Sequence, residues 1–461
     1  MKNNVFAGAN VLEDFLNPEN HKTPLVELPE KLNPFLKKKI HIFLKMQTFL
    51  PLNNIKSISA RGLLHSYGDL SQYHTMVENS SGNTAFSLAV LGRMYGIDTM
   101  KAWVSNEIPK NKMQILQLFG VEPHVNEEQI CPNPKDPKSW IEKSRQEGKQ
   151  EGWMNPWQYD NPSNPQIHYT ITGRQIRKQI ATLDDQYHFQ YFCAGLGTTG
   201  TFLWISRYLK KQKPSMKSIG VVRKANNPIP WPRTLHLLRM VDFDRKSELD
   251  FLQEIGTKRA FEMSLTLLRN GLVVGPSSWM ALCGLFDFLE KEEKSDSSEE
   301  KSCIVICPDS PYLYLDEYFK YCSSSLFPKI HNADLLLDKT SIPQEQQEID
   351  DDKFFIKAKD LLDLIQSEPK EYQLIDIREK DEFAHTHIKY ALNIPFNLEH
   401  LEEYRPYQKK HLILICNYGK KSLYLAKKLN DQGYQVSSLE EGFIERSELG
   451  YPRETPIACK L

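Results

Sequence analysis

Short apolar runs alternate with longer amphipathic segments through most of the chain, from about residue 36 to residue 335. In chain order, the clearest of these are Ile40–Met46, Thr84–Tyr95, Phe189–Ala194, Phe202–Leu209 and Ser302–Cys307. A run of about 4–8 apolar residues is typical of a buried strand, and a longer segment with one apolar face is typical of a helix. Strands that alternate with helices predict an α/β fold with a doubly wound parallel sheet.

A change in composition divides the chain after residue 337. Residues 338–353 contain Pro343, a glutamine-rich patch and three consecutive aspartates, which is typical of an exposed linker. The alternation then restarts on a smaller scale, with predicted helices at Ala358–Gln366 and Lys421–Gln432 and predicted strands at Tyr372–Ile377 and His411–Cys416. The predicted organisation is a large domain at 1–337, a linker at 338–353 and a small α/β domain at 354–455.

Composition narrows the classes of protein that the chain can represent. Its 461 residues carry 58 basic and 59 acidic side chains, a net charge of −1, so no field of one sign favours nucleic acid or an anionic membrane. No apolar stretch approaches the roughly 20 residues that span a bilayer, and Met1–Asn10 does not resemble a secretory signal. The eight cysteines show no CxxC spacing, so we expect neither a metal site nor a disulfide framework. We also expect a cytoplasmic location.

Lys56 is the only charged residue in the stretch Pro51–Ser57 and precedes a predicted helix at Ser59–His65. A lysine buried at the end of a sheet has a lowered pKa, because desolvation disfavours the ammonium form. The free amine can then form a Schiff base with an aldehyde and later transfer a proton. The alternative is an ordinary surface lysine, so the interpretation depends on the rest of the chain.

Two polar segments precede predicted helices. Gly195-Leu196-Gly197-Thr198-Thr199-Gly200-Thr201 follows an apolar run, and its glycines and hydroxyls suit a phosphate at a helix N-terminus. It lacks the lysine of a P-loop, which disfavours a nucleotide site of that class. Glu78-Asn79-Ser80-Ser81-Gly82-Asn83-Thr84 has hydroxyls that suit a carboxylate, with simple helix capping as the alternative.

The order of these segments resembles the cysteine synthase and cystathionine β-synthase family, whose members are fold-type II pyridoxal phosphate enzymes. The segments that carry the resemblance are Lys56, Ser80–Thr84, Gln158–Asn164, Gly195–Thr201, Gly275–Ser278 and Cys307–Ser310, followed by Tyr312 and Tyr318. The resemblance covers roughly residues 36–325. It implies pyridoxal 5′-phosphate as cofactor and a homodimer.

The resemblance also implies roles for individual residues. Lys56 would form an imine with the cofactor, Asn83 would contact its 3′ oxygen, and Ser277 would face its ring nitrogen. The phosphate would be bound by Gly197, Thr198, Thr199, Gly200 and Thr201, and the substrate carboxylate by Ser80, Ser81, Gly82 and Thr84, helped by Gln158. The sequence departs from the family at Ser57-Ile58, at Trp279 and at Trp231-Pro232-Arg233, which replaces an expected glycine-rich substrate segment.

The small domain has its own candidate nucleophile. Cys416 ends an apolar run and is followed by Asn417, Tyr418, Gly419, Lys420 and Lys421, which open a predicted helix. A cysteine at a helix N-terminus beside lysines is expected to have a lowered pKa, and the alternative is a buried strand-end cysteine. Together with Leu374–Arg378, His387-Ile388, Ala391–Pro395 and Glu440–Gly442, this loop resembles a rhodanese domain. That resemblance makes Cys416 a persulfide carrier, Lys420 and Lys421 its electrostatic helpers, and Asp376–Arg378 a supporting ion pair.

These features predict β-elimination and replacement on a serine- or cysteine-type amino acid, with a thiol or sulfide as the second substrate. A first alternative is release of sulfur from cysteine or homocysteine, with sulfide or persulfide passed to Cys416. A second alternative, from a different class, is a non-catalytic sulfur-sensing or scaffold protein.

Overall fold

The computed structural model describes residues 4–127, 136–183, 187–239, 247–292, 300–331, 352–367, 371–398, 400–440, 442–445 and 453–454. The chain divides into two compact units, Met1–Gln346 and Gln347–Leu461. Residues 338–351 of the predicted linker lie outside the described part, so the linker stays a prediction.

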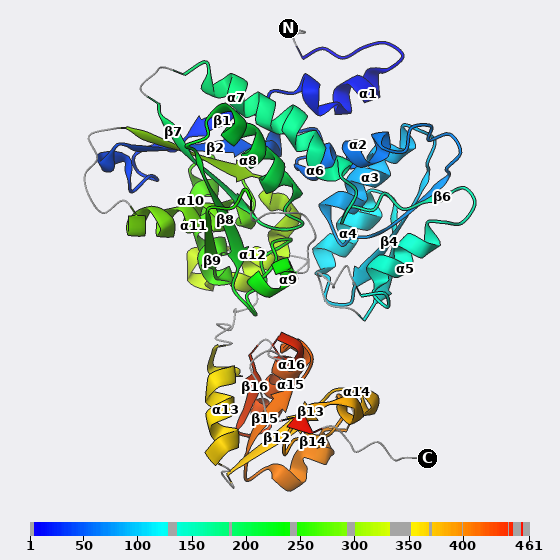
Figure 1. The fold of residues 1–461 in the computed structure, drawn as a ribbon, viewed down its shortest axis with the longest axis vertical. Helices are drawn as coiled ribbons and strands as arrows, with labels where there is room; N and C mark the ends of the chain where they lie inside the picture. Colours follow the sequence, from blue (N-terminus) through cyan, green and yellow to red (C-terminus); the bar gives the residue numbers. More distant parts are fainter. Residues whose placement is uncertain are drawn as a thin grey trace. The chain divides into compact units, whose positions relative to one another are not determined.

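The first unit is built on two sheets, each at the centre of one lobe (Figure 1). The larger sheet has the strand order β1-β2-β10-β7-β8-β9, and all neighbouring pairs are parallel except β1 with β2. Its strands are β1 (Leu25–Glu27), β2 (Ile40–Met46), β7 (Phe189–Gly195), β8 (Lys217–Arg223), β9 (Phe251–Ile255) and β10 (Lys301–Cys307).

Helices cover both faces of the larger sheet. Alternate residues of β10 point to opposite faces, so Cys303 and Val305 pack in one core while Ile304 and Ile306 pack in the other. The first core includes α10 (Thr257–Arg269) and α11 (Pro276–Glu292), and the second includes α8 (Gly200–Gln212). This arrangement confirms the predicted doubly wound sheet.

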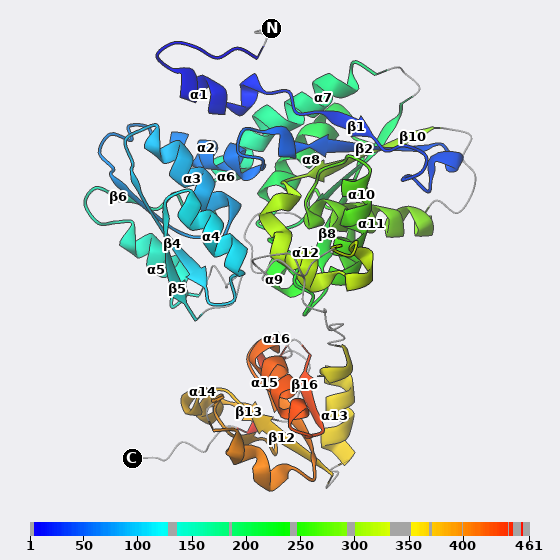
Figure 2. The same cartoon turned by 180° about the vertical axis from the view of Figure 1, so that it is seen from behind.

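The smaller sheet has the order β5-β4-β3-β6 and is parallel throughout (Figure 2). Its strands are β3 (Thr75–Asn79), β4 (Thr99–Ser105), β5 (Val121–Asn126) and β6 (Trp153–Met154). The other helices of this unit are α1 (Val11–Leu16), α2 (Lys56–His65), α3 (Asn83–Arg93), α4 (Lys110–Leu118), α5 (Trp140–Glu147), α6 (Ser163–His168), α7 (Arg174–Ile180), α9 (Leu235–Arg239) and α12 (Leu315–Tyr321), with a π-helical turn, η4 (Tyr169–Gly173), between α6 and α7.

The second unit is a small α/β domain. Its main sheet is parallel, in the order β11-β16-β15-β12-β14, and β13 pairs with β17 in an antiparallel ribbon. The strands are β11 (Phe355–Ile356), β12 (Tyr372–Asp376), β13 (His387–Ile388), β14 (Leu392–Asn393), β15 (His411–Ile415), β16 (Val436–Leu439) and β17 (Arg453–Glu454). The helices are α13 (Ala358–Ser367), α14 (Lys380–His385), α15 (Lys420–Asp431) and α16 (Gly442–Glu445).

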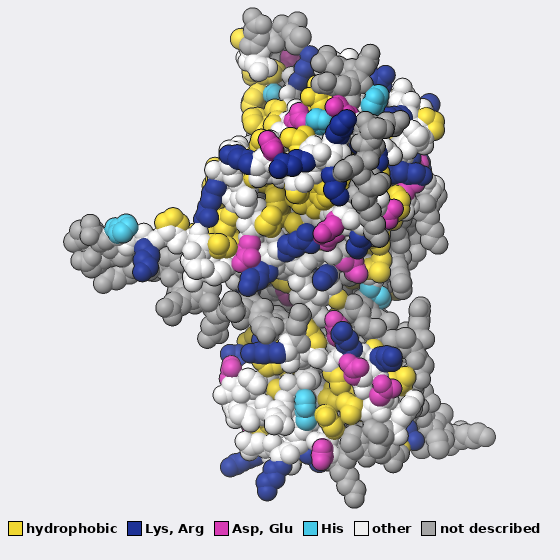
Figure 3. Space-filling model, turned by 90° about the vertical axis from the view of Figure 1, so that its left-hand side faces the viewer, with side chains coloured by type: hydrophobic (Ala, Val, Ile, Leu, Met, Phe, Trp, Pro, Cys, Tyr) yellow, Lys and Arg dark blue, Asp and Glu magenta, His cyan; other side chains and the backbone are white. Residues whose placement is uncertain are grey.

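Basic and acidic side chains are intermixed on the face shown in Figure 3. This mixture agrees with the nearly balanced charge of the sequence, −1 overall. Among the described helices, none is long and apolar enough to cross a bilayer.

Candidate active site

A cavity in the first unit lies where strands of both sheets end. Parallel strands present their carboxyl ends at one edge, where loops are free to carry functional side chains. The loops after β2, β3, β7 and β10 supply most of the lining. The polar and charged residues that line the cavity are Lys56, Asn79, Ser80, Ser81, Asn83, Thr84, Lys112, Gln158, Tyr159, Thr198, Thr201, Arg233, Asp309 and Tyr314.

Lys56 begins α2, three residues earlier than the helix that the sequence pattern predicts at Ser59–His65. The lysine therefore projects from a helix N-terminus into the cavity rather than from a loop. Burial of its amine lowers the pKa of Lys56 from 10.5 to about 8, and the negative charge of Asp309 opposes the shift. A pKa of about 8 leaves an appreciable fraction of neutral amine near neutral pH.

Asp309, at the end of β10, is fully buried beside Lys56. Its Oδ2 atom accepts a hydrogen bond from Asn83 Nδ2 at 2.8 Å and another from the Tyr314 hydroxyl. Burial raises the pKa of Asp309 to about 6, although these two hydrogen bonds act in the opposite direction. The carboxylate thus fixes the amide of Asn83 and sets the charge around the lysine.

The segment Ser80–Thr84 lies at the start of α3, and its side chains do not cap that helix. The N-cap is Gly82, and no side chain accepts a capping hydrogen bond there. Thr84 Oγ1 instead donates to Gln158 Oε1 at 3.2 Å, and Gln158 Nε2 donates to the Asn79 carbonyl at 3.1 Å. This geometry disfavours simple capping and places Gln158 beside the segment, as a carboxylate site requires.

The turn Gly195–Thr201 joins β7 to α8, again without a side-chain cap on the helix. Thr199 has a φ of 69°, a left-handed conformation that is uncommon for threonine. Its hydroxyl is buried and has no hydrogen-bond partner within the described part of the chain. A buried donor beside a helix N-terminus fits a phosphate, which accepts such hydrogen bonds.

His168 connects the lysine helix to the helix after the turn. Its Nε2 atom lies 3.0 Å from Ser59 Oγ on α2 and 3.1 Å from Thr201 Oγ1 on α8. Its Nδ1 atom lies 3.1 Å from Thr172 Oγ1 in the π-helical turn η4. Burial lowers the pKa of His168 to about 3, with a further contribution from the charge of Lys56, so the imidazole is neutral.

Trp231 lines the cavity, and its Nε1 donates to Ser277 Oγ at 3.0 Å. Ser277, Thr199 and Gly200 are predicted site residues that do not line the cavity in the described part of the chain. Thr199 and Gly200 are flanked by Thr198 and Thr201, which do.

The sequence interpretation did not assign roles to Asp309, His168 or Trp231 in this site. Asp309 stands in a segment that carries the family resemblance, and Trp231 stands in one that departs from it; those positions were the available signal. His168 is an isolated histidine in an amphipathic stretch, and nothing in the pattern separates it from a core residue.

In the second unit, Cys416 follows β15 and precedes α15, and only 5% of it is exposed. Its Sγ atom lies 3.2 Å from Ser422 Oγ and accepts the Ser422 backbone N–H at 3.4 Å. Gly419, with a φ of 76°, is the N-cap of α15 and has no side chain to close the helix end. Asn417, Tyr418 and Gly419 therefore form a loop over the N-terminus of α15.

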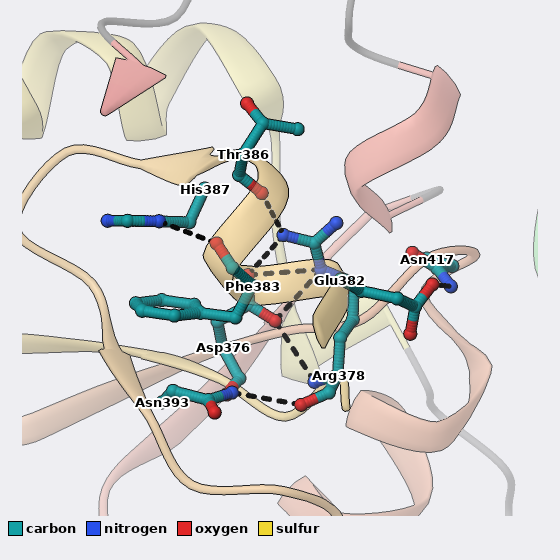
Figure 4. A network of polar contacts seen from close by, with 8 residues as sticks. All are labelled: Asp376, Arg378, Glu382, Phe383, Thr386, His387, Asn393 and Asn417. Carbon is teal, nitrogen blue, oxygen red and sulfur yellow. Dashed lines mark hydrogen bonds and ion pairs between the residues drawn. The ribbon is translucent and has the colours of Figure 1, made fainter. Parts of the chain in front are cut away.

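A polar network supports this loop (Figure 4). Glu382 on α14 accepts a hydrogen bond from Asn417 Nδ2 at 2.7 Å. Behind it, Arg378 Nη2 lies 2.6 Å from Asp376 Oδ2 and donates to the Thr386 carbonyl at 2.8 Å. The predicted ion pair of Asp376 and Arg378 is therefore confirmed, and both residues are buried.

The chain matches two families over separate ranges. Residues 16–309 match the pyridoxal-phosphate dependent enzyme family, and residues 357–446 match the rhodanese-like domain.

Relatives of the first unit are synthases of sulfur amino acids. The chain is 28% identical over 319 residues to cystathionine beta-synthase of Saccharomyces cerevisiae, a match that covers 64% of this chain and 61% of the yeast protein. It is 24% identical to a cysteine synthase of Staphylococcus aureus, over 64% of this chain and 92% of that protein.

Solved structures share the fold of the first unit. The O-acetylserine dependent cystathionine beta-synthase from Helicobacter pylori has a TM-score of 0.55 at 22% identity, covering 66% of this chain and 96% of that one. A hydrogen sulfide-producing enzyme from Fusobacterium nucleatum has a TM-score of 0.56 at 21% identity, covering 67% and 100%.

The matched range of the first family spans most of the chain, and the fold agrees with it. The residues around the cavity fit the cofactor of that family, with a buried lysine of lowered pKa, an unpartnered buried hydroxyl and a glycine-rich helix start. The chain belongs to the pyridoxal-phosphate dependent enzyme family, uses pyridoxal 5′-phosphate as its cofactor and carries a C-terminal rhodanese-like domain.

Proposed function

We propose that the first unit catalyses β-elimination and replacement on a serine- or cysteine-type amino acid, with a thiol or sulfide as nucleophile. One observation carries the proposal. The cavity brings together Lys56, the Ser80–Thr84 segment and the Gly195–Thr201 turn, which are far apart in sequence. The likeness to cystathionine beta-synthase and cysteine synthase supports the same reaction class.

In this proposal the cofactor is bound at several points. Lys56 would hold its aldehyde carbon, and Asn83 would contact its 3′ oxygen. Ser277 would face its ring nitrogen, and its phosphate would be bound by Gly197, Thr198, Thr199, Gly200 and Thr201. The bound cofactor supplies an electron sink that makes the α-proton of an amino acid acidic.

The substrate carboxylate would rest on the start of α3. Ser80, Ser81, Gly82 and Thr84 offer hydroxyl and backbone N–H donors there, and the helix dipole favours a negative charge. Gln158 is held beside them by its bond to the Asn79 carbonyl at 3.1 Å, which leaves the amide fixed in orientation.

Lys56 also acts as the base. Its Nζ atom is the amine with a lowered pKa in the cavity, so near neutral pH it can accept the α-proton of the substrate. Asp309 lies beside it and stabilises the ammonium form once the proton has been taken.

Chemical trapping tests the role of Lys56. Borohydride should reduce the bond between the cofactor and its lysine, and peptide mass mapping should find the tag on Lys56. Lys45 is an internal control, because burial lowers its pKa to about 7 but it does not line the cavity. A tag on Lys45 or on no lysine would contradict the assignment.

Replacement of the lysine tests the chemistry. Lys56→Ala should lose β-elimination by about 10²–10⁴-fold, because the base is gone. A substrate panel of serine, O-acetylserine, O-phosphoserine, cysteine and cystathionine, with sulfide or homocysteine, identifies the reaction. Turnover by Lys56→Ala at the rate of the unchanged protein would refute the role of the lysine.

A second candidate function is release of sulfur from cysteine or homocysteine as sulfide or persulfide, with Cys416 accepting only sulfane sulfur such as that of a persulfide, because sulfide itself would need a two-electron oxidant. The loop over the N-terminus of α15 favours it, since the thiolate can attack the sulfane sulfur of a donor such as thiosulfate. The new S–S bond forms at Cys416, and sulfite leaves with the electron pair of the broken bond. Cyanide should then receive the sulfur as thiocyanate, and Cys416→Ser should abolish that transfer.

A non-catalytic sulfur-sensing or scaffold protein is the remaining alternative. Addition of serine or cysteine to the protein with bound pyridoxal phosphate distinguishes an enzyme from a scaffold. An enzyme changes its absorbance and forms product, whereas a scaffold forms no product. The proposal also includes a homodimer, which sedimentation would test, and a cytoplasmic location, which cell fractionation would test.

A further inference from the structure

Arg233 is a buried cation in the wall of the cavity. Only 3% of the residue is exposed, and it lines the same cavity as Lys56. Within the described part of the chain, its guanidinium makes one hydrogen bond, from Nη1 to the Leu237 carbonyl at 3.3 Å, and no ion pair with an acidic side chain. Arginines are almost never buried to this degree without an anionic partner. The cavity is therefore the place to look for that anion.

Arg233 is attached to the turn Gly195–Thr201. Its backbone N–H donates to the carbonyl of Leu196, inside the turn, at 2.9 Å. Two residues earlier, the Trp231 carbonyl oxygen would lie 3.4 Å from a Cβ atom added at Gly197. The segment 231–233 thus packs along the turn that is proposed to hold the cofactor's phosphate.

The other cations that line the cavity, among the described residues, have different surroundings. Lys56 is the amine proposed to hold the cofactor's aldehyde carbon. Lys112 belongs to α4 in the lobe of the smaller sheet, where its Nζ lies 3.9 Å from Glu317 and 5.1 Å from the centre of the Tyr314 ring. Arg233 is the cation of this set that is hydrogen-bonded to the turn.

The turn itself cannot neutralise a phosphate. It contains no charged residue, only glycines, threonines and one leucine. The N-terminus of a helix such as α8 contributes the equivalent of roughly half a positive charge. A phosphate group carries about −1.5 to −2 at pH 7. A phosphate in the turn would therefore lack a cation, while the arginine beside the turn lacks an anion.

We propose that Arg233 is the cationic partner of the cofactor's phosphate. This inference rests on the proposed placement of that phosphate at Gly195–Thr201 and adds a charged side chain to it. Guanidinium and phosphate form charge-assisted hydrogen bonds, often in pairs, which also fix the orientation of the phosphate. A phosphorylated substrate such as O-phosphoserine is another source of the same group, and the experiment separates the two sources.

The affinity of the full chain for pyridoxal phosphate and for pyridoxal, from absorbance titrations, tests the inference. Arg233→Met removes the charge and keeps similar bulk, so the affinity for pyridoxal phosphate should fall by about tenfold to a hundredfold. The affinity for pyridoxal, which has no phosphate, should not change. Arg233→Lys keeps the charge and should bind pyridoxal phosphate more tightly than Arg233→Met. Equal losses for the two ligands, or equal affinities of the two variants, would overturn the assignment.

Arg223→Met is the matched control. Arg223 is also buried, and its Nε donates to the Pro232 carbonyl at 2.9 Å, but it does not line the cavity. It should leave the ratio of the two affinities unchanged. If the ratio fell in Arg223→Met as much as in Arg233→Met, disturbance of the segment 231–233 would explain both results, and the proposed contact would be refuted.

Stability gives a readout that a structural arginine would not produce. Without cofactor, the first unit of Arg233→Met should have a Tm at least as high as that of the unchanged full chain, because the substitution removes a buried charge that has no carboxylate partner. With saturating pyridoxal phosphate, the unchanged protein should have the higher Tm. A lower Tm for Arg233→Met already in the absence of cofactor would identify a structural role and contradict the proposal.

Kinetics separate the cofactor's phosphate from that of a substrate. At saturating pyridoxal phosphate, Arg233→Met should leave the ratio of kcat/KM values for O-phosphoserine and O-acetylserine unchanged. A selective loss with O-phosphoserine, at unchanged affinity for pyridoxal phosphate, would assign the arginine to the substrate and overturn the inference. The borohydride tag reports on the cofactor site independently. If Lys56 of the unchanged protein is not tagged, the proposed site fails; if it is tagged and the affinity ratio does not move in Arg233→Met, only the role of Arg233 fails.

Discussion

The side chains around Lys56 show how burial and charge act on one group. Burial lowers the pKa of Lys56 to about 8, and Asp309 opposes that shift. Asp309 itself is held by Asn83 and Tyr314, so its negative charge is fixed in position. The lysine is therefore a usable base, because the effect of burial outweighs that of Asp309 and brings its pKa to about 8.

Removal of the charge at Asp309 should shift this balance. In Asp309→Asn, the ammonium form of Lys56 loses its stabilising partner, so the pKa of Lys56 falls further. When pyridoxal phosphate is added to the cofactor-free protein, the absorbance of the bound form should develop with a pH midpoint near 8 in the unchanged protein. The midpoint should lie at lower pH in Asp309→Asn.

Glu317→Gln is a suitable control for this experiment. Glu317 is also a buried acid, but it lies near Lys112, at 3.9 Å, and does not contribute to the pKa of Lys56. Its replacement should leave the midpoint where it is. A midpoint that is equally unchanged in Asp309→Asn would show that the carboxylate does not act on the lysine.

Glu78 predicts a pH dependence of stability. Burial raises its folded-state pKa from 4.5 to about 7. Its contribution to stability is therefore complete below about pH 4.5 and is lost as pH rises through about 7. The free energy of unfolding of the first unit, from denaturant titrations, should fall over that range and fall less in Glu78→Gln. Equal slopes in the two proteins would contradict this prediction.

Individual residues of the site were predictable where the chain carries a local signal. Lys56 stands alone in an uncharged stretch, and the glycines and threonines of 195–201 precede a helix. The contact of Asn83 with Asp309 joins residues 226 positions apart, so it depends on the packing of two sheets and no local pattern contains it. The contact between Trp231 and Ser277 was not predictable for the same reason, because it joins residues 46 positions apart.

At the scale of elements, the strands were predicted more closely than the helix starts. β2 begins and ends at Ile40 and Met46, as the apolar run indicates, because a central strand is buried on both faces. α2 begins at Lys56 instead of Ser59, since the polar residues before its apolar face also adopt helical geometry. Local hydrophobicity does not mark that boundary.

The contact between α16 and the Cys416 loop gives a prediction at this scale. Gly442 has a φ of 76°, and a Cβ atom there would lie 2.5 Å from the backbone nitrogens of Tyr418 and Gly419. Gly442→Ala should destabilise the second unit by about 1–3 kcal/mol and displace the loop. Denaturant unfolding and sulfur transfer from thiosulfate to cyanide would measure both effects.

Gly433→Ala separates backbone strain from the contact. Gly433 has a φ of 86°, but a Cβ atom there would meet nothing within 4 Å. It should lose some stability through strain alone and keep the sulfur transfer of the unchanged protein. If both variants lose transfer equally, contact with the loop is not the reason.

At the scale of the whole molecule, each unit buries its own apolar core. The cores of the first unit contain residues from both of its sheets, and those of the second are formed by residues after 353. The alternation of apolar runs predicted both units, because hydrophobic periodicity marks sheets and helices wherever they occur. Between the two units, the composition of residues 338–353 predicts an exposed linker.

Separate cores predict separate unfolding. Calorimetry of the full chain should show two transitions, and pyridoxal phosphate should raise the temperature of only one of them. At a concentration 100 times the Kd, the stabilisation should be about 2.7 kcal/mol. A single transition that moves as a whole would show that the units unfold together.

One buried imidazole has a consequence for how the first unit handles its cofactor. His168 touches the helix that carries the lysine and the helix that follows the phosphate turn. In the proposed function, these two elements bind the aldehyde and the phosphate of the same cofactor, so one imidazole contacts both of them. A cofactor analogue that lacks the phosphate should therefore bind less tightly, and its aldehyde should also be less well aligned with Lys56.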